Sequence, residues 1–216
     1  MTRYISIIVF AALIIILGNS CKKENRNIFT GTISEMISGN AAENVEIIIE
    51  VNELKSAGFS TGFEEIGRVF TDDNGEFEFE TGSYQAIEYR FTLVKNGYFT
   101  RSFTIEPTDL INEYHIIEEI GLESNLKICI KNASPLNEND QMKYRVKNIH
   151  NKCEVCCQTS YRYFYGTDID TIITCPVTGL NSIQIEQVVI RDTETEHRMQ
   201  AVYCEPNDTM TVNIFY

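Results

Sequence analysis

Six cysteines in the C-terminal half of the chain are the residues whose type and spacing best suit chemistry. They are Cys129, Cys153, Cys156, Cys157, Cys175 and Cys204. Three of them follow His150 in the pattern His-x2-Cys-x2-Cys-Cys, which offers nitrogen and sulfur ligands to a metal ion. The pattern lacks the second Cys-x2-Cys pair that is typical of a structural zinc site. An even number of cysteines in an exported protein favours disulfides. We therefore expect disulfides, with a metal site at 150–157 and free thiols as the alternatives.

The pairing of these cysteines is not specified by the sequence. Cys156 and Cys157 are adjacent, and adjacent side chains on a strand point to opposite faces. We therefore expect these two residues to have different partners.

His115 and Glu118 have the spacing of the first two ligands of a zinc carboxypeptidase. On a strand, however, residues three apart point to opposite faces, so His115 would share a face with Ile117. A catalytic zinc also needs a third ligand, and His197 is the distant histidine of the second half. We expect no zinc site, no cofactor and no catalytic residue, and hence not an enzyme.

Two further motifs have both a structural and a functional interpretation. Asp72-Asp73-Asn74-Gly75 clusters oxygen ligands, but it lacks the alternate spacing and the distant glutamate of a calcium loop, so we predict a hairpin turn. Tyr161, Tyr163 and Tyr165 share one face of a predicted strand. Such a row can stack on sugar rings. The sequence has no tryptophan, and we expect the row to lie in the core and in cross-strand aromatic pairs.

The elements that must position these residues are strands almost throughout. Apolar and polar residues alternate, for example in 45–51, 77–80, 89–93 and 126–131, as in half-buried antiparallel strands. Residues 53–66 contain two glycines, which predicts a loop. The chain is predicted to be all-β, with two antiparallel β-sandwich domains of about seven strands each. We place them at residues 28–121 and 122–216, and the second contains all six cysteines named above.

The first domain resembles the carboxypeptidase regulatory-like domain, which has a transthyretin-like β-sandwich fold. The resemblance rests on GTISEMISGNAAENVEIII from Gly31, on TDDNGEFEFE from Thr71 and on VKNGY from Val94. It covers about residues 28–106, and it implies an accessory domain without catalysis. The second domain has no family resemblance that we recognise.

The first 21 residues are predicted to contain an export signal, and the alternative is an uncleaved membrane anchor. Arg3 precedes an apolar run from Tyr4 to Leu17, which is shorter than the roughly 20 residues of a membrane span. Gly18-Asn19-Ser20-Cys21 resembles the lipobox of bacterial lipoproteins. The resemblance implies a signal peptide at 1–20, a lipid on Cys21, a tether at 21–27 and, because Lys22 follows, the outer membrane.

The charge balance excludes one class of partner. With 31 acidic and 18 basic residues the net charge is −13, so nucleic acid would be repelled. We expect a non-catalytic cell-envelope lipoprotein that is a binding or structural accessory module. The alternatives are a glycan- or protein-binding component of a surface nutrient-uptake system and a metal-binding protein. The sequence does not specify the ligand, the oligomeric state or the orientation in the envelope.

Overall fold

The computed structural model describes residues 26–54, 60–107 and 113–216, and all the regular structure in these ranges is β-strand. The first half contains β1 (Arg26–Glu35), β2 (Glu46–Leu54), β3 (Ser60–Phe70), β4 (Glu76–Gly82), β5 (Ala86–Val94), β6 (Arg101–Ile105) and β7 (Glu113–Ile120). The second half contains β8 (Glu123–Lys131), β9 (Gln141–Lys147), β10 (Arg162–Tyr165), β11 (Asp170–Thr178), β12 (Asn181–Arg191), β13 (Glu194–Cys204) and β14 (Thr209–Phe215). The prediction of an all-β chain with two sandwiches is confirmed.

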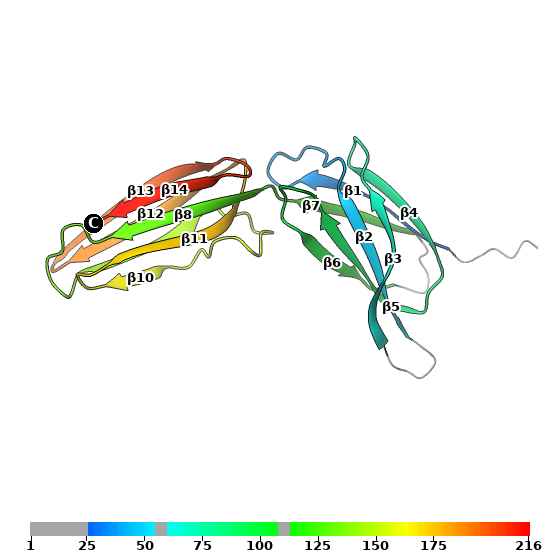
Figure 1. The fold of residues 1–216 in the computed structure, drawn as a ribbon, viewed down its shortest axis with the longest axis horizontal. Helices are drawn as coiled ribbons and strands as arrows, with labels where there is room; N and C mark the ends of the chain where they lie inside the picture. The colour runs from blue at the N-terminus through cyan, green and yellow to red at the C-terminus, as the bar shows by residue number, and fades with distance from the viewer. Residues whose placement is uncertain (1–25, 55–59, 108–112) are drawn as a thin grey trace, which may run out of the picture.

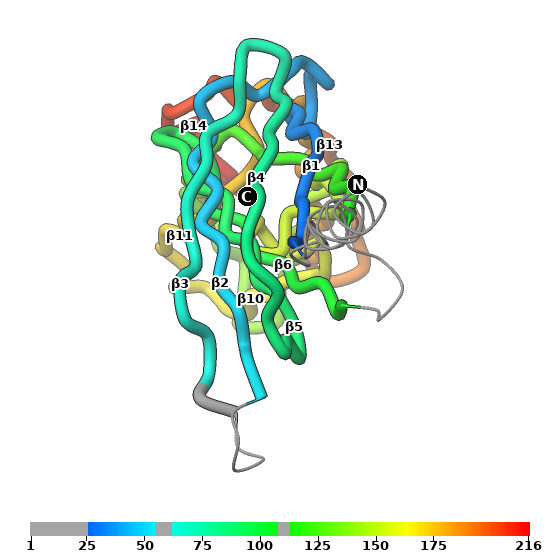
Figure 2. Tube along the Cα trace, turned by 90° about the vertical axis from the view of Figure 1, so that its right-hand side faces the viewer, coloured from blue at the N-terminus to red at the C-terminus, as the bar shows by residue number. Residues whose placement is uncertain are grey.

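The first sandwich packs a three-stranded sheet, β4-β1-β7, against a four-stranded sheet, β3-β2-β5-β6. Buried residues alternate with more exposed ones from Ile47 to Val51 in β2 and from Tyr89 to Leu93 in β5, so these segments give one face to the core. The largest buried side chains include Phe29, Tyr89 and Phe91. Figure 2 looks along the long axis with this sandwich in front, and it shows β2 and β3 running side by side.

The second sandwich has the same layering, with β11-β8-β14 packed against β10-β9-β12-β13. Its core is mostly aliphatic and includes Leu126, Ile128, Val146, Ile183 and Ile185. Among the described strands, each sandwich is antiparallel except for one parallel pair, β1 with β7 and β8 with β14. These pairs join the first and last strands of each half, which local alternation does not reveal.

A short, hydrogen-bonded connection joins the two sandwiches, which lie end to end (Figure 1). Leu122 forms a bridge with Tyr98, and the amide of Glu123 donates to the carbonyl of Gly97 over 2.8 Å. On the other side, the amide of Asn207 donates to the carbonyl of Glu123 over 2.7 Å. Because the connection is paired on both sides, it restricts the orientation of one sandwich relative to the other.

One predicted loop is largely strand. β2 continues to Leu54 and β3 begins at Ser60, so most of the region 53–66 extends the hairpin, although residues 55–59 lie outside the described ranges. The prediction failed because Gly62 lies in a register shift of the β2–β3 pair, with a φ of 82°, and the strand continues past it.

The predicted signal peptide, Cys21 and most of the tether also lie outside the described residues. Within the described ranges, no helix is long and apolar enough to cross a membrane.

Candidate functional site

An exposed row of tyrosines on the second sandwich is the feature best suited to binding. Tyr163 and Tyr165 lie on β10, an edge strand, and their side chains are 55% and 60% exposed. Tyr161 precedes the strand and is half-buried. We call these three residues the tyrosine ladder. The prediction that the row lies in the core is wrong for Tyr163 and Tyr165.

Phe164 explains why the tyrosines face outward. It alternates with them and points to the opposite face, where it packs against the core. Its ring is stacked on that of buried Tyr144, with centroids 6.1 Å apart and planes 16° from parallel. This contact holds β10 against β9, and the alternation then places the tyrosine rings in solvent.

The ladder is regularly spaced. The ring centroids of Tyr161 and Tyr163 are 6.3 Å apart, and those of Tyr163 and Tyr165 are 6.4 Å apart. The planes of the second pair lie within 7° of parallel. Tyrosine rings lose little conformational entropy when they bind, and their hydroxyl groups donate and accept hydrogen bonds. The ladder therefore offers a flat ligand both apolar and polar contacts.

Two cations from β9 lie beside the ladder. Lys143 is directly opposite Tyr163 in the strand register. Its Nζ lies 4.8 Å from the ring centroid of Tyr161 and 5.8 Å from that of Tyr163. The guanidinium carbon of Arg145 lies 4.6 Å from the Tyr161 centroid. These are cation–π distances, so the ring faces orient both basic groups.

Glu186 on β12 neutralises part of this charge. Arg145 donates to its carboxylate over 2.7 Å, and the Nζ of Lys147 lies 3.7 Å from it. Hydrogen bonds from Arg145 and Tyr161 hold the pKa of Glu186 below its usual value, although burial acts in the opposite direction. Burial and a hydrogen bond to Glu186 raise the pKa of Tyr161. At neutral pH, Glu186 is therefore ionised and Tyr161 keeps its proton.

Four of the six cysteines named from the sequence form disulfides, Cys153–Cys156 and Cys157–Cys175. Adjacent Cys156 and Cys157 have different partners, as expected. The predicted reason is wrong, because both residues lie in the loop between β9 and β10 and not on a strand. The three sulfurs near His150 are bonded to other sulfurs and are not thiolates, which removes the ligands of the alternative metal site. Within the described ranges, no group of three or more His, Cys, Asp or Glu side chains is placed to hold a metal ion.

The other two candidates, Cys129 and Cys204, are free thiols in the structure. Cys129 alternates with the buried residues of β8 and faces outward. Cys204 is the last residue of β13, and its side chain is buried in the core of the second sandwich. The two sulfurs therefore point to different environments. Burial raises the pKa of the Cys204 thiol to about 11, so it stays protonated at neutral pH.

The remaining motifs have structural roles. His115 is exposed and hydrogen-bonds Thr30 over 3.3 Å, whereas Glu118 points to the other face of β7 and pairs with Arg101. In the 72–75 turn, Oδ1 of Asp72 accepts the amides of Asn74 and Glu76 at 2.9 and 2.8 Å. This carboxylate oxygen is thus already used by the turn. The prediction of a hairpin here is wrong, because β3 pairs with β2 and β4 pairs with β1, so the turn connects strands of two different sheets.

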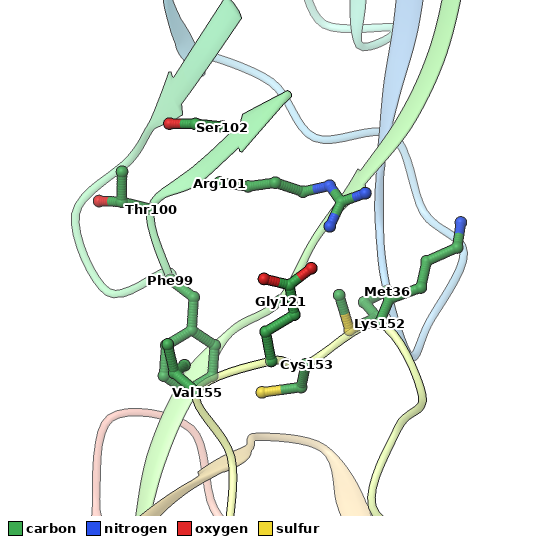
Figure 3. Close-up of a pocket in the computed structure, with 10 residues that line it drawn as sticks. Met36, Phe99, Thr100, Arg101, Ser102, Gly121, Lys152, Cys153 and Val155 are labelled. Carbon is green, nitrogen blue, oxygen red and sulfur yellow. The ribbon is translucent and has the colours of Figure 1, made fainter. Parts of the chain in front are cut away.

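A small pocket lies where the two sandwiches meet (Figure 3). Arg101 and Phe99 line it from the first sandwich, and Lys152 and Cys153 line it from the second. Lys152 also pairs with Glu119 over 2.9 Å across the junction. The pocket volume is about 90 Å³, well below the roughly 300 Å³ at which ligand pockets begin. It therefore belongs to the packing of the junction.

The tyrosine row was noted from the sequence, but the basic residues beside it, Lys143 and Arg145, were not predicted. The signal was present in Gln141–Lys147, where Lys143, Arg145 and Lys147 alternate with apolar Met142, Tyr144 and Val146 and therefore share one face. The pairing of β9 with β10, which brings these cations to the tyrosines, could not be predicted from the sequence.

No protein-family model and no curated protein matches this chain. Among solved structures, the shaft pilin SpaA from Lactobacillus rhamnosus GG is similar at 10% identity and a TM-score of 0.35, over 89% of this chain and 98% of that chain. The Bacillus anthracis TIE protein is similar at 14% identity and a TM-score of 0.36, over 88% of this chain and 33% of its own length. A 3-chlorocatechol 1,2-dioxygenase from Rhodococcus opacus 1CP is similar at 14% identity and a TM-score of 0.36, over 48% of this chain and 62% of that chain. Identities and TM-scores this low carry no argument about function.

Proposed function

We propose that this chain is a non-catalytic, lipid-anchored module of the bacterial cell envelope that binds glycans through the tyrosine ladder. The observation that carries the proposal is the exposure of Tyr163 and Tyr165 beside oriented cations. The first sandwich, which resembles an accessory domain in its motifs, is the spacer between the anchor and the binding surface.

The chemistry of the ladder suits a sugar. One face of a pyranose ring carries mostly C–H groups, which pack on an aromatic ring, while its hydroxyl groups need polar partners at the edge. The rings at 6.3 and 6.4 Å spacing give repeated apolar contacts. Arg145, Lys143 and the tyrosine hydroxyls surround them with polar groups.

Glu186 supports binding rather than hydrolysis. A general acid for glycoside cleavage needs a raised carboxyl pKa so that it keeps its proton near neutral pH. The pKa of Glu186 is lowered by Arg145 and Tyr161, so this carboxylate beside the ladder is ionised. It orients Arg145 and Tyr161 and does not donate a proton.

The anchor prediction concerns Cys21. In a bacterial host grown with labelled fatty acid, the wild-type protein should incorporate label and Cys21→Ser should not, because the thiol is the acylation site of the lipobox. Several acyl chains, at about 0.8 kcal/mol per buried methylene, hold such a protein at the membrane. Equal labelling of both proteins contradicts the anchor.

The binding prediction concerns the two exposed rings. Tyr163→Ala combined with Tyr165→Ala should weaken binding to a glycan array of neutral and acidic polysaccharides by about 10-fold to 100-fold, since each ring contact contributes about 0.5–1.5 kcal/mol. Array signals for the wild type and the double variant are the measurement.

Phe70→Ala is the matched control, because Phe70 is 59% exposed but lies on β3 of the first sandwich. It should leave the array signals unchanged. The proposed function is wrong if the wild type binds no polysaccharide, or if the double variant and the control behave alike.

A further inference from the structure

We infer that the tyrosine ladder selects anionic glycans, polymers whose sugar rings carry carboxylate or sulfate groups, and that Lys143 determines this specificity. The inference rests on the proposed function and names its ligand class.

The strand register leaves the ammonium of Lys143 without a carboxylate partner. In the four-stranded sheet, Lys143 lies between Tyr163 on β10 and Val188 on β12. Directly opposed residues face the same side of a sheet, so the cross-strand neighbours of Lys143 are a tyrosine and a valine. Val188 is buried, at 3% exposed, and brings no charge to the site. Among the ion pairs of the described residues, none includes Lys143.

The neighbouring cations on β9 differ in this respect. Arg145 and Lys147 both pair with Glu186, at 2.7 and 3.7 Å. Glu186 is therefore already shared by two cations. Lys143 is held by the faces of Tyr161 and Tyr163 instead, which orient its ammonium and leave its charge uncompensated.

The local charge favours an anion although the whole chain is acidic. Three cations on β9 face one carboxylate, Glu186, so this face is positive while the full sequence carries a net charge of −13. At physiological salt, charges more than about 8 Å away are largely screened. A ligand at the ladder therefore responds mainly to Lys143 and its neighbours.

These two properties together specify the ligand. The rings need a flat, partly apolar sugar face, and the ammonium needs an anion within about one side-chain length of that face. A neutral glycan can stack on the tyrosine rings but offers no anion to Lys143. An acidic peptide offers an anion to Lys143 but no sugar face to the rings. A polymer with carboxylate or sulfate on the sugar ring satisfies both, which is the basis of the inference.

The test uses the full chain in detergent and four polymers, with affinity measured by calorimetric titration. Polygalacturonate carries carboxylates, dextran sulfate carries sulfates, dextran is neutral, and polyglutamate is anionic without sugar rings. We expect at least one of the two anionic glycans to bind about tenfold more tightly than both dextran and polyglutamate. Whichever of the two binds identifies carboxylate or sulfate as the recognised group.

Lys143→Gln should remove that preference and bring the anionic glycan to the affinity of dextran. Lys127→Gln is the matched control, because Lys127 is also half-buried and lies on β8, outside the ladder's sheet. It should bind like the wild type. The inference is overturned if Lys143→Gln keeps the preference, or if dextran or polyglutamate binds as tightly as the anionic glycans. In those cases the proposed function stands as long as the double tyrosine variant loses binding, and it fails separately if no glycan binds.

Discussion

Replacing Phe29 with alanine should lower the free energy of unfolding of the first sandwich by about 3–5 kcal/mol, the cost of removing a buried phenylalanine. Phe29 is fully buried and sits among three other aromatic rings. Its centroid lies 4.9 Å from that of Tyr89, 5.2 Å from that of Phe91 and 5.1 Å from that of Tyr114. The substitution therefore leaves a cavity and breaks contacts between both sheets.

The measurement for Phe29→Ala is urea unfolding of the full chain followed by far-ultraviolet circular dichroism. Phe70→Ala, at an exposed position, should change the free energy of unfolding by no more than about 0.5 kcal/mol. Equal losses for the two variants would mean that Phe29 is not the centre of the core.

Removing the Cys157–Cys175 disulfide with serine at both positions should destabilise the second sandwich by about 3 kcal/mol. A disulfide restricts the unfolded chain more when it closes a longer loop. This one spans 18 residues, whereas Cys153–Cys156 spans three, for which the same relation gives about 1.6 kcal/mol. The double variant of Cys153 and Cys156 is therefore the matched control.

Thermal unfolding of the full chain measures both disulfide variants. The longer loop should cost the second sandwich more than about 10 °C and the shorter loop about half as much. Residues 28–121 contain no cysteine, so the first sandwich should unfold at the same temperature in all three proteins. The account of the disulfides fails if the two variants lose equal stability.

The strands themselves were predictable, because alternation of apolar and polar residues is a local property. Both β2 and β5 carry their buried residues at the alternating positions that the sequence indicates. The parallel pairing of β1 with β7 was not predictable, since it joins segments more than 80 residues apart whose patterns are compatible with several neighbours.

The buried face of the tyrosine ladder's strand was also not predictable from the sequence. Residues 161–165 are aromatic at four of five positions, so alternation does not say which face is buried. The choice is made by β9, where buried Tyr144 receives the ring of Phe164. Likewise, Cys157 lies outside the strands and pairs with Cys175 on β11, 18 positions away, which a local pattern does not indicate.

The most direct test of glycan binding through the ladder is an aromatic ¹H–¹³C NMR titration of the full chain with oligomers of the polysaccharide that binds it most tightly. The rings of Tyr161, Tyr163 and Tyr165 should shift together, with one common saturation curve, because a ligand stacked on them changes their local magnetic environment. The ring of Phe70 should not move. Saturable binding without shifts at the ladder, or with the largest shifts on the first sandwich, would contradict the account.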